Sequence, residues 1–141
     1  MRTLLLASLL ALGAAAGCST SESKQPAGEL VEAKVPTISI DELDAKIARN
    51  EYQAVDANGE GTRKKLGVIP GAVLLTDSES FGPSELPADK AKGLVFYCAN
   101  TACGASHEAA AKAMTAGYTN VKVLPEGIAG WVKAGKKVQT I

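Results

Sequence analysis

The feature that most restricts the fold of this chain is a short apolar run that ends in a cysteine. The run 94–97, Leu-Val-Phe-Tyr, leads into Cys98 and the loop 99–104, and an alanine-rich stretch covers 106–116. An apolar run followed by a loop and a helical segment predicts a buried parallel strand and its crossover helix. The thiol would then lie at the carboxyl edge of a sheet, where α/β proteins bind ligands, and beside a helix N-terminus, which stabilises a thiolate. This position indicates sulfur chemistry.

The rest of the chain alternates between strand and helix patterns. We expect strands over 52–56, 72–75, 94–97 and 121–124, and helices over 40–48, 106–116 and 127–133. A glycine-rich turn is predicted over 58–61, and the long connection 76–93 has room for one helical turn. Aromatic residues make up only 4% of the chain, so the core must come from Ala, Val, Leu and Ile. The alternation predicts a three-layer α/β/α fold with a mainly parallel sheet.

The first 17 residues have the pattern of an export signal. A basic start is followed by the mostly apolar run 4–16, which ends in the small residues 15–17. The run is shorter than the about 20 residues that a membrane-spanning helix needs. The segment resembles a bacterial lipoprotein signal, whose first mature residue is a lipid-modified cysteine, here Cys18. The alternative is an ordinary secretory signal followed by an incidental cysteine.

This interpretation divides the chain into a signal peptide, 1–17, a lipid-bearing Cys18 with a polar tether, 18–34, and a folded domain, 35–141. The tether could span at most roughly 55 Å, so the domain would work close to a membrane surface. We expect a lipid-anchored protein on the periplasmic side of a bacterial membrane. Ser19 resembles signals for delivery to the outer membrane, which is therefore favoured.

Charge and cysteine usage exclude several classes of protein. The chain has 15 Lys and Arg against 15 Asp and Glu, without a basic stripe, so we expect no nucleic-acid partner. Cys98, Cys103 and His107 are too few for a four-ligand zinc site, and we expect neither a metal nor a cofactor. Export would place the two cysteines in an oxidising compartment, where a thiol pair can persist as a disulfide.

Residues 35–141 resemble the single-domain rhodanese family. The landmarks occur in family order: Asp56 at a strand end, Ile69-Pro70-Gly71-Ala72, Tyr97-Cys98, Ser106 with Ala109 and Ala110, Gly117-Tyr118, Asn120-Val121, Gly127-Ile128, Trp131 and Ala134-Gly135. The resemblance implies that Cys98 takes a sulfane sulfur as a persulfide from a donor such as thiosulfate and passes it to a thiol or cyanide. The expected partners are a small sulfur-containing anion and a protein or small-molecule thiol.

The loop after Cys98 is expected to bind the anion. Its backbone N–H groups would form a cradle that stabilises charge developing at the donor sulfur. Besides Cys103, the residues of this cradle are Ala99, Asn100, Thr101, Ala102 and Gly104.

Three positions depart from the family pattern. The family's Asp-x-Arg is 56–58, Asp-Ala-Asn, in this chain, and Val68 stands in place of a histidine. The active loop is two residues longer, with Ala105 where the family has an arginine. A charge-assisted hydrogen bond contributes about 1.5–3 kcal/mol, so its loss would weaken thiosulfate use by roughly 10- to 150-fold. The cations Arg63, Lys64 and Lys65 would compensate if they lay near the loop, but they are expected to lie in a solvated loop.

The loop has gained a second thiol, Cys103. Beside a persulfide or sulfenic acid on Cys98, it would act as a resolving group that displaces the outer group and leaves a disulfide. The alternatives are two unpaired thiols or a static bridge, which would stabilise the fold by only about 2 kcal/mol for so short a loop.

Three polar residues near the predicted site have simpler expected roles. His107, in the first turn of the helix after the loop, is either a general acid or a solvated side chain. Asp56 is expected to be a hydrogen-bonding residue at its strand end. Ser106 is expected to be the N-cap of the helix.

Three functions are compatible with these patterns. The first is a membrane-tethered, rhodanese-like sulfurtransferase or persulfide carrier. The second is a thiol–disulfide or peroxide-responsive redox protein that uses the Cys98–Cys103 pair, and the third is a non-catalytic binding module. The retained Cys98 favours the first two, whereas the missing loop arginine favours the last two.

Overall fold

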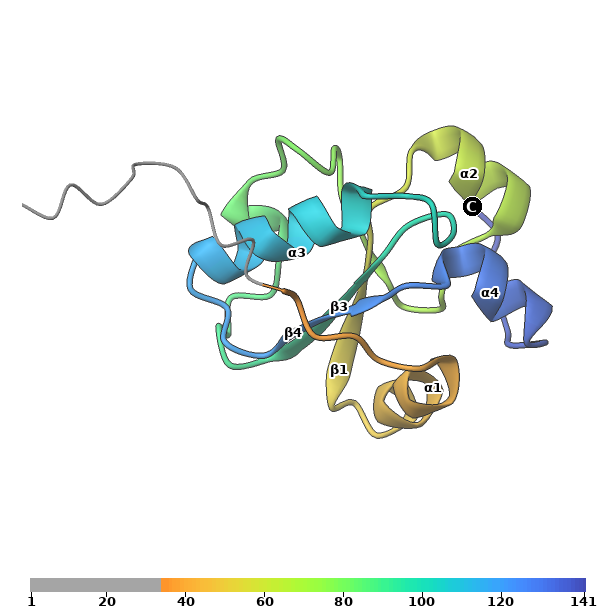
Figure 1. The fold of residues 1–141 in the computed structure, drawn as a ribbon, viewed down its shortest axis with the longest axis horizontal. Helices are drawn as coiled ribbons and strands as arrows, with labels where there is room; N and C mark the ends of the chain where they lie inside the picture. Colours follow the sequence, from red (N-terminus) through yellow and green to blue (C-terminus); the bar gives the residue numbers. More distant parts are fainter. Residues whose placement is uncertain (1–33) are drawn as a thin grey trace, which may run out of the picture. The chain divides into compact units, whose positions relative to one another are not determined.

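The sheet predicted from the strand patterns is present in the computed structural model, which describes residues 34–141 (Figure 1). Its four strands are parallel and lie in the order β2-β1-β3-β4. Their bounds are Tyr52–Asp56 for β1, Val73–Leu74 for β2, Gly93–Tyr97 for β3 and Val121–Leu124 for β4. The helices are α1, Ile40–Ala48, α2, Glu60–Leu66, α3, Ala105–Thr115, and α4, Gly127–Lys133, with a 3-10 turn η1 at Pro83–Glu85.

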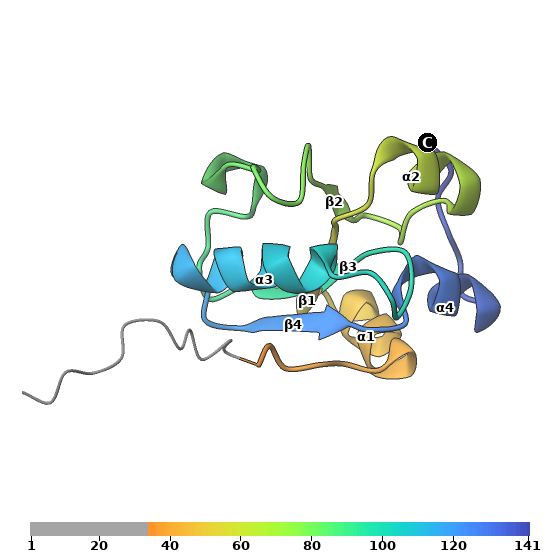
Figure 2. The same ribbon diagram turned by 45° about the horizontal axis from the view of Figure 1, so that its top comes forward.

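Helices cover both faces of this sheet, as Figures 1 and 2 show. On one face α3 packs through Ala109, Ala110 and Ala113, whose small side chains allow a close approach to the strands. On the other face α1 and α4 pack through Leu43 and Trp131. Every residue of β3 is buried, as expected for a central strand covered on both sides. The three-layer α/β/α fold is therefore confirmed.

The register brings the carboxyl ends of three strands to one edge. Asp56 of β1 pairs with Tyr97 of β3, and Tyr97 pairs with Leu124 of β4. The pairing continues past the strand end, because the Ala57 N–H donates to the Tyr97 carbonyl at 2.9 Å. Cys98, which directly follows Tyr97, therefore lies in the middle of this edge.

The turn predicted over 58–61 is wrong in its second half, because α2 begins at Glu60. This helix starts beside glycines and has no buried residue, so it lacks the apolar periodicity by which helices are found. Its side chains make polar contacts, among them the Glu60–Lys64 ion pair at 2.5 Å, and Leu66 at its end packs half-buried against the core. That spacing of four residues, followed by Gly67 at a φ of 76°, is the signal that could have identified the helix.

The remaining differences lie at element ends. The edge strand β2 covers 73–74 rather than 72–75, and α3 covers 105–115 rather than 106–116. The helical turn predicted within 76–93 is present as η1.

The predicted export signal, Cys18 and the tether up to residue 33 lie outside the described residues. Among residues 34–141, no helix is both long and apolar enough to cross a membrane.

Candidate active site

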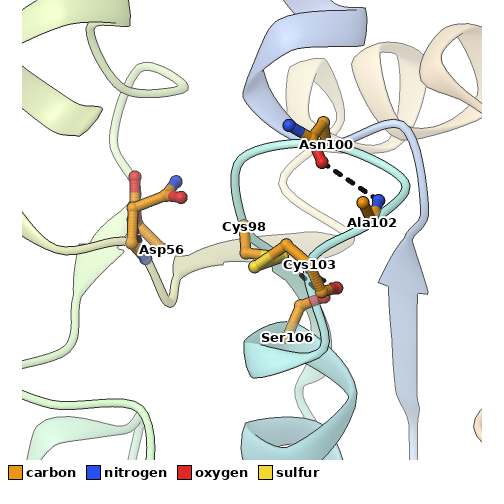
Figure 3. Close-up of a disulfide and its surroundings, with 7 residues drawn as sticks. Asp56, Cys98, Asn100, Ala102, Cys103 and Ser106 are labelled. Atoms are coloured by element: carbon orange, nitrogen blue, oxygen red, sulfur yellow. Dashed lines mark hydrogen bonds between the residues drawn. A yellow bond between two sulfur atoms is a disulfide. The ribbon is translucent and has the colours of Figure 1, made fainter.

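A disulfide joins Cys98 to Cys103 and closes the loop between β3 and α3 (Figure 3). The two Cα atoms are 6.3 Å apart. Only 2% of the Cys98 surface is exposed, whereas Cys103 is half-buried. Of the alternatives that the sequence left open, the structure therefore contains the disulfide rather than two unpaired thiols. Cys103 is the more accessible of the two cysteines.

The sulfur of Cys98 lies beside two oxygen atoms. Its Sγ is 3.2 Å from the carbonyl oxygen of Cys103 and 3.4 Å from the Ser106 hydroxyl oxygen. Ser106 is itself buried, with 2% of its surface exposed. In the reduced protein a hydroxyl donating to this sulfur would stabilise the thiolate, since a hydrogen bond to the charged form favours that form.

The N-cap role predicted for Ser106 is wrong. Helix α3 begins one residue earlier, at Ala105, and Gly104 is its N-cap residue. Ser106 is consequently inside the first turn, where its side chain points toward the sheet rather than back over the helix end. The hydroxyl of Ser106 therefore lies beside Cys98 Sγ instead of capping the helix.

The loop folds around Asn100. Its side-chain Oδ1 accepts a hydrogen bond from the Ala102 N–H at 3.0 Å, and its carbonyl accepts one from the Cys103 N–H at 3.1 Å (Figure 3). These two N–H groups are engaged and are not free for an anion, contrary to expectation. The other predicted members of the cradle, Ala99, Asn100, Thr101 and Gly104, have no backbone acceptor for their N–H groups among residues 34–141.

The start of α4 anchors the loop that follows Cys98, a contact that local patterns did not predict. The Ile128 N–H donates to the Cys98 carbonyl at 2.8 Å, and the Ala129 N–H donates to the Ala99 carbonyl at 3.0 Å. Both donors belong to the first turn of a helix, where N–H groups lack partners within the helix. Gly127, at a φ of 60°, allows the two backbones to approach each other. The loop's position is therefore set by a segment about 30 residues further along the chain.

Asp56 is fully buried at the end of β1 and has the hydrogen-bonding role expected for it. Its Oδ1 accepts from the Asn58 N–H at 2.7 Å and from Arg63 Nε at 3.2 Å. Arg63 also donates to the carbonyls of Asp56, at 3.1 Å, and Leu75, at 2.8 Å. The solvated loop expected for Arg63 is wrong, since 11% of its side chain is exposed. Its guanidinium neutralises Asp56 and is not free for an anion at Cys98.

Tyr97, immediately before Cys98, is also part of this buried polar cluster. Its hydroxyl oxygen accepts a hydrogen bond from the Ile69 N–H at 3.0 Å. Burial and, after it, the charge of Asp56 raise the pKa of Tyr97, so the phenol stays protonated near neutral pH. Asp56 Oδ2 and Asn58 Nδ2 are buried without a hydrogen-bond partner in the described part of the chain.

His107 is exposed on the first turn of α3. In residues 34–141 no hydrogen bond links the side chain of His107 or of Asp56 to Cys98, so the structure brings together only Cys98, Cys103 and Ser106. Within the same residues, no three His, Cys, Asp or Glu side chains are grouped to hold a metal ion.

Comparison with known proteins yields one family match and several similar structures. The family model for the rhodanese-like domain matches residues 39–134. The BH2092 protein from Bacillus halodurans is 26% identical, with a TM-score of 0.66 over 74% of this chain and 77% of that chain. No curated protein sequence matches this chain.

Two further solved structures, each less than 25% identical, share the fold. The rhodanese-like domain of Alr3790 from Anabaena sp. is 20% identical, with a TM-score of 0.63 over 75% of this chain and 80% of that chain. The 3-mercaptopyruvate sulfotransferase SseA from Escherichia coli is 22% identical, with a TM-score of 0.61 over 76% of this chain and 51% of that chain.

Proposed function

This chain belongs to the rhodanese-like domain family, and from that premise we propose that it is a sulfurtransferase or persulfide carrier with Cys98 as nucleophile. The observation that carries the proposal is the pairing of Cys98 with Cys103 in the loop at the carboxyl edge of the sheet. The pairing means that a second thiol reaches the sulfur on which a persulfide would form. The Ser106 hydroxyl beside that sulfur, and the four unengaged N–H groups of the loop, support a site for an anionic donor.

The proposed chemistry has two steps. In the first, the Cys98 thiolate attacks the outer sulfur of thiosulfate, a sulfur–sulfur bond of the donor breaks, and sulfite leaves with its electron pair. In the second, the Cys103 thiolate attacks Cys98 Sγ and displaces the outer sulfur as hydrogen sulfide, which leaves the disulfide. Two thiols and one thiosulfate give one disulfide, one sulfite and one hydrogen sulfide. An external thiol then reduces the disulfide for the next cycle.

The test uses the chain with Cys18→Ser, in which Cys98 and Cys103 are the only thiols. After reduction and exposure to thiosulfate, we expect this chain to lose two hydrogens and release sulfide and sulfite in equal amounts. With Cys103→Ser added, we expect it to gain one sulfur atom and retain it, because the resolving thiol is gone. Intact mass spectrometry and assays of both products follow the reaction. A chain that releases no sulfite and gains no sulfur with any sulfane-sulfur donor would contradict the proposal.

The second candidate function is a thiol–disulfide redox protein. It is favoured by the disulfide together with the absence of a cationic side chain from Ala99 to Ser106, since disulfide exchange needs no anion-binding cation. For this function, mild oxidation would form the disulfide without any sulfane donor, and activity would require both cysteines. A binding module would be indifferent to the loss of either one.

We further propose that the protein is exported and anchored by a lipid on Cys18, on the periplasmic side of a bacterial membrane. The support is the signal-like pattern of residues 1–17 followed by Cys18 and Ser19. In a bacterial host, the native chain should incorporate labelled palmitate and sediment with membranes. The Cys18→Ser chain should do neither, and equal labelling of the two chains would refute the anchor.

A further inference from the structure

A cavity of about 460 Å³ lies between α1, α4 and the segments that follow α2 and α4. Its apolar wall includes Ile47 of α1, Ile69, Pro70 and Trp131 of α4. This volume is within the range of small-molecule sites, roughly 300–1,000 Å³. None of the lining residues belongs to the loop around Cys98, so the cavity is separate from the active site described above.

The walls of the cavity are fixed by contacts within the protein. Lys136 pairs with Asp44 at 2.8 Å and with Asp41 at 2.9 Å, which ties the segment after α4 to α1. Val68 and Gln139 exchange backbone hydrogen bonds of 2.9 and 2.8 Å, which tie the same segment to the end of α2. A site whose walls are already ordered binds its ligand with little additional loss of conformational entropy.

The charges of the lining favour an acidic ligand. The lining contains two cationic residues, Lys136 and Lys137, and one carboxylate, Asp44. Lys136 is engaged by α1, whereas Lys137 has no ion-pair partner in the described part of the chain. Lys137 lines the cavity and is exposed, and its carbonyl accepts a hydrogen bond from Trp131 Nε1 at 2.8 Å. An apolar body with a single acidic group matches these surroundings.

Two walls of the cavity are directly connected to residues around the nucleophile. Trp131 belongs to α4, whose first turn donates hydrogen bonds to the carbonyls of Cys98 and Ala99. Ile69 donates its N–H to the hydroxyl of Tyr97, the residue before Cys98. Ile69 and Trp131 are themselves buried, at 0% and 2% exposed, so a ligand in the cavity would bias the position of the loop by shifting these two residues, provided that it binds one loop position better than another.

We propose that this cavity binds a small aromatic or aliphatic acid, and that its occupation changes the reactivity of Cys98 through α4. The inference goes beyond the proposed function and does not depend on sulfur transfer. The reactivity of the thiol toward an alkylating reagent is sufficient to detect the effect.

The binding test uses two fluorescent probes with the same apolar body on the full chain with Cys18→Ser. Anilinonaphthalene sulfonate carries an acidic group, and N-phenylnaphthylamine does not. Trp131 is the only tryptophan of the chain, so energy transfer from it reports a probe bound to the domain, and the substitutions below locate it in the cavity. We expect the sulfonate to bind with transfer, and Lys137→Gln to weaken the sulfonate about three- to fivefold while leaving the neutral probe unchanged.

A matched pair of substitutions on α1 localises the binding. Ala48 is exposed and lines the cavity, so Ala48→Phe should fold and fill the space. Ala45 is exposed on the same helix and does not line it, so Ala45→Phe is the control. We expect Ala48→Phe to weaken both probes at least about tenfold and Ala45→Phe to leave them unchanged. Equal effects of the two substitutions, or no energy transfer, would overturn the proposal.

The coupling test measures alkylation of Cys98 by iodoacetamide in the full chain with Cys18→Ser and Cys103→Ser, where Cys98 is the only thiol. We expect the rate to change about fivefold or more at saturating sulfonate probe, a size typical of coupling between sites. The same chain with Ala48→Phe should show no change at that probe concentration. An unchanged alkylation rate in the saturated parent chain would also overturn the proposal.

Discussion

Replacing Cys98 with serine is expected to abolish sulfur loading completely. A serine hydroxyl cannot carry a sulfane sulfur, and its pKa keeps it protonated where a thiol at a helix N-terminus ionises. The substitution is small, and the new oxygen would lie near the Cys103 carbonyl and the Ser106 hydroxyl, so the fold should persist. Intact mass spectrometry after exposure of the reduced chain to thiosulfate measures the effect.

The control for this experiment is Cys103→Ser. Both substitutions remove the disulfide, so any loss of stability that results from the missing bridge is common to the two variants. Only Cys98→Ser removes the proposed nucleophile. If the Cys98→Ser chain, with Cys18→Ser also present in all variants, still gains one sulfur atom, the assignment is wrong and Cys103 carries the sulfur.

Replacing Gly127 with alanine is expected to cost about 2–5 kcal/mol of stability and to displace the active loop. A Cβ at this position would lie 2.5 Å from the Cys98 carbonyl oxygen and 2.7 Å from the Ala99 carbonyl carbon. Both atoms belong to the backbone and cannot move aside without shifting the loop. The φ of 60° adds about 1–2 kcal/mol for a residue with a side chain, and overpacking typically adds about 1–3 kcal/mol.

The control Gly71→Ala separates the cost of the positive φ from the cost of the steric clash. Gly71 has a φ of 75°, but a Cβ there would have no neighbour within 4 Å, so only the backbone conformation is penalised. We expect a loss of about 1–2 kcal/mol for this control. Urea unfolding of each variant measures the stability, and sulfur loading reports the position of the loop. Equal losses of stability in the two variants would show that the contact between α4 and the loop is unimportant.

Many of the helices and strands around the site can be predicted from local sequence patterns. The bounds of β1, β4 and α4 are those expected from the sequence, because each element has a continuous apolar face and ends beside a residue that stops it. Helix α2 does not follow from such a pattern, since it has no fully buried side chain and only the half-buried Leu66 packs against the core. Arg63 shows why this matters: it belongs to a run of cations typical of solvent, yet it neutralises a buried carboxylate seven residues earlier.

The sequence by itself determined that Cys98 lies at a strand end before a helix, with a second cysteine in the same loop. This was possible because the strand, the loop and the helix follow one another in the chain, and each is recognised from its own residues. Only the tertiary structure decided which groups contact the sulfur and the loop. Ser106 contacts Cys98 from the first turn of α3, which begins one residue earlier than its sequence indicates. The first turn of α4 reaches the loop because the register of β3 and β4 aligns their ends. A shift of one residue in a helix start or in the strand register changes the local interaction energy little. The packing of the whole domain therefore determines where each helix starts and how the strands align.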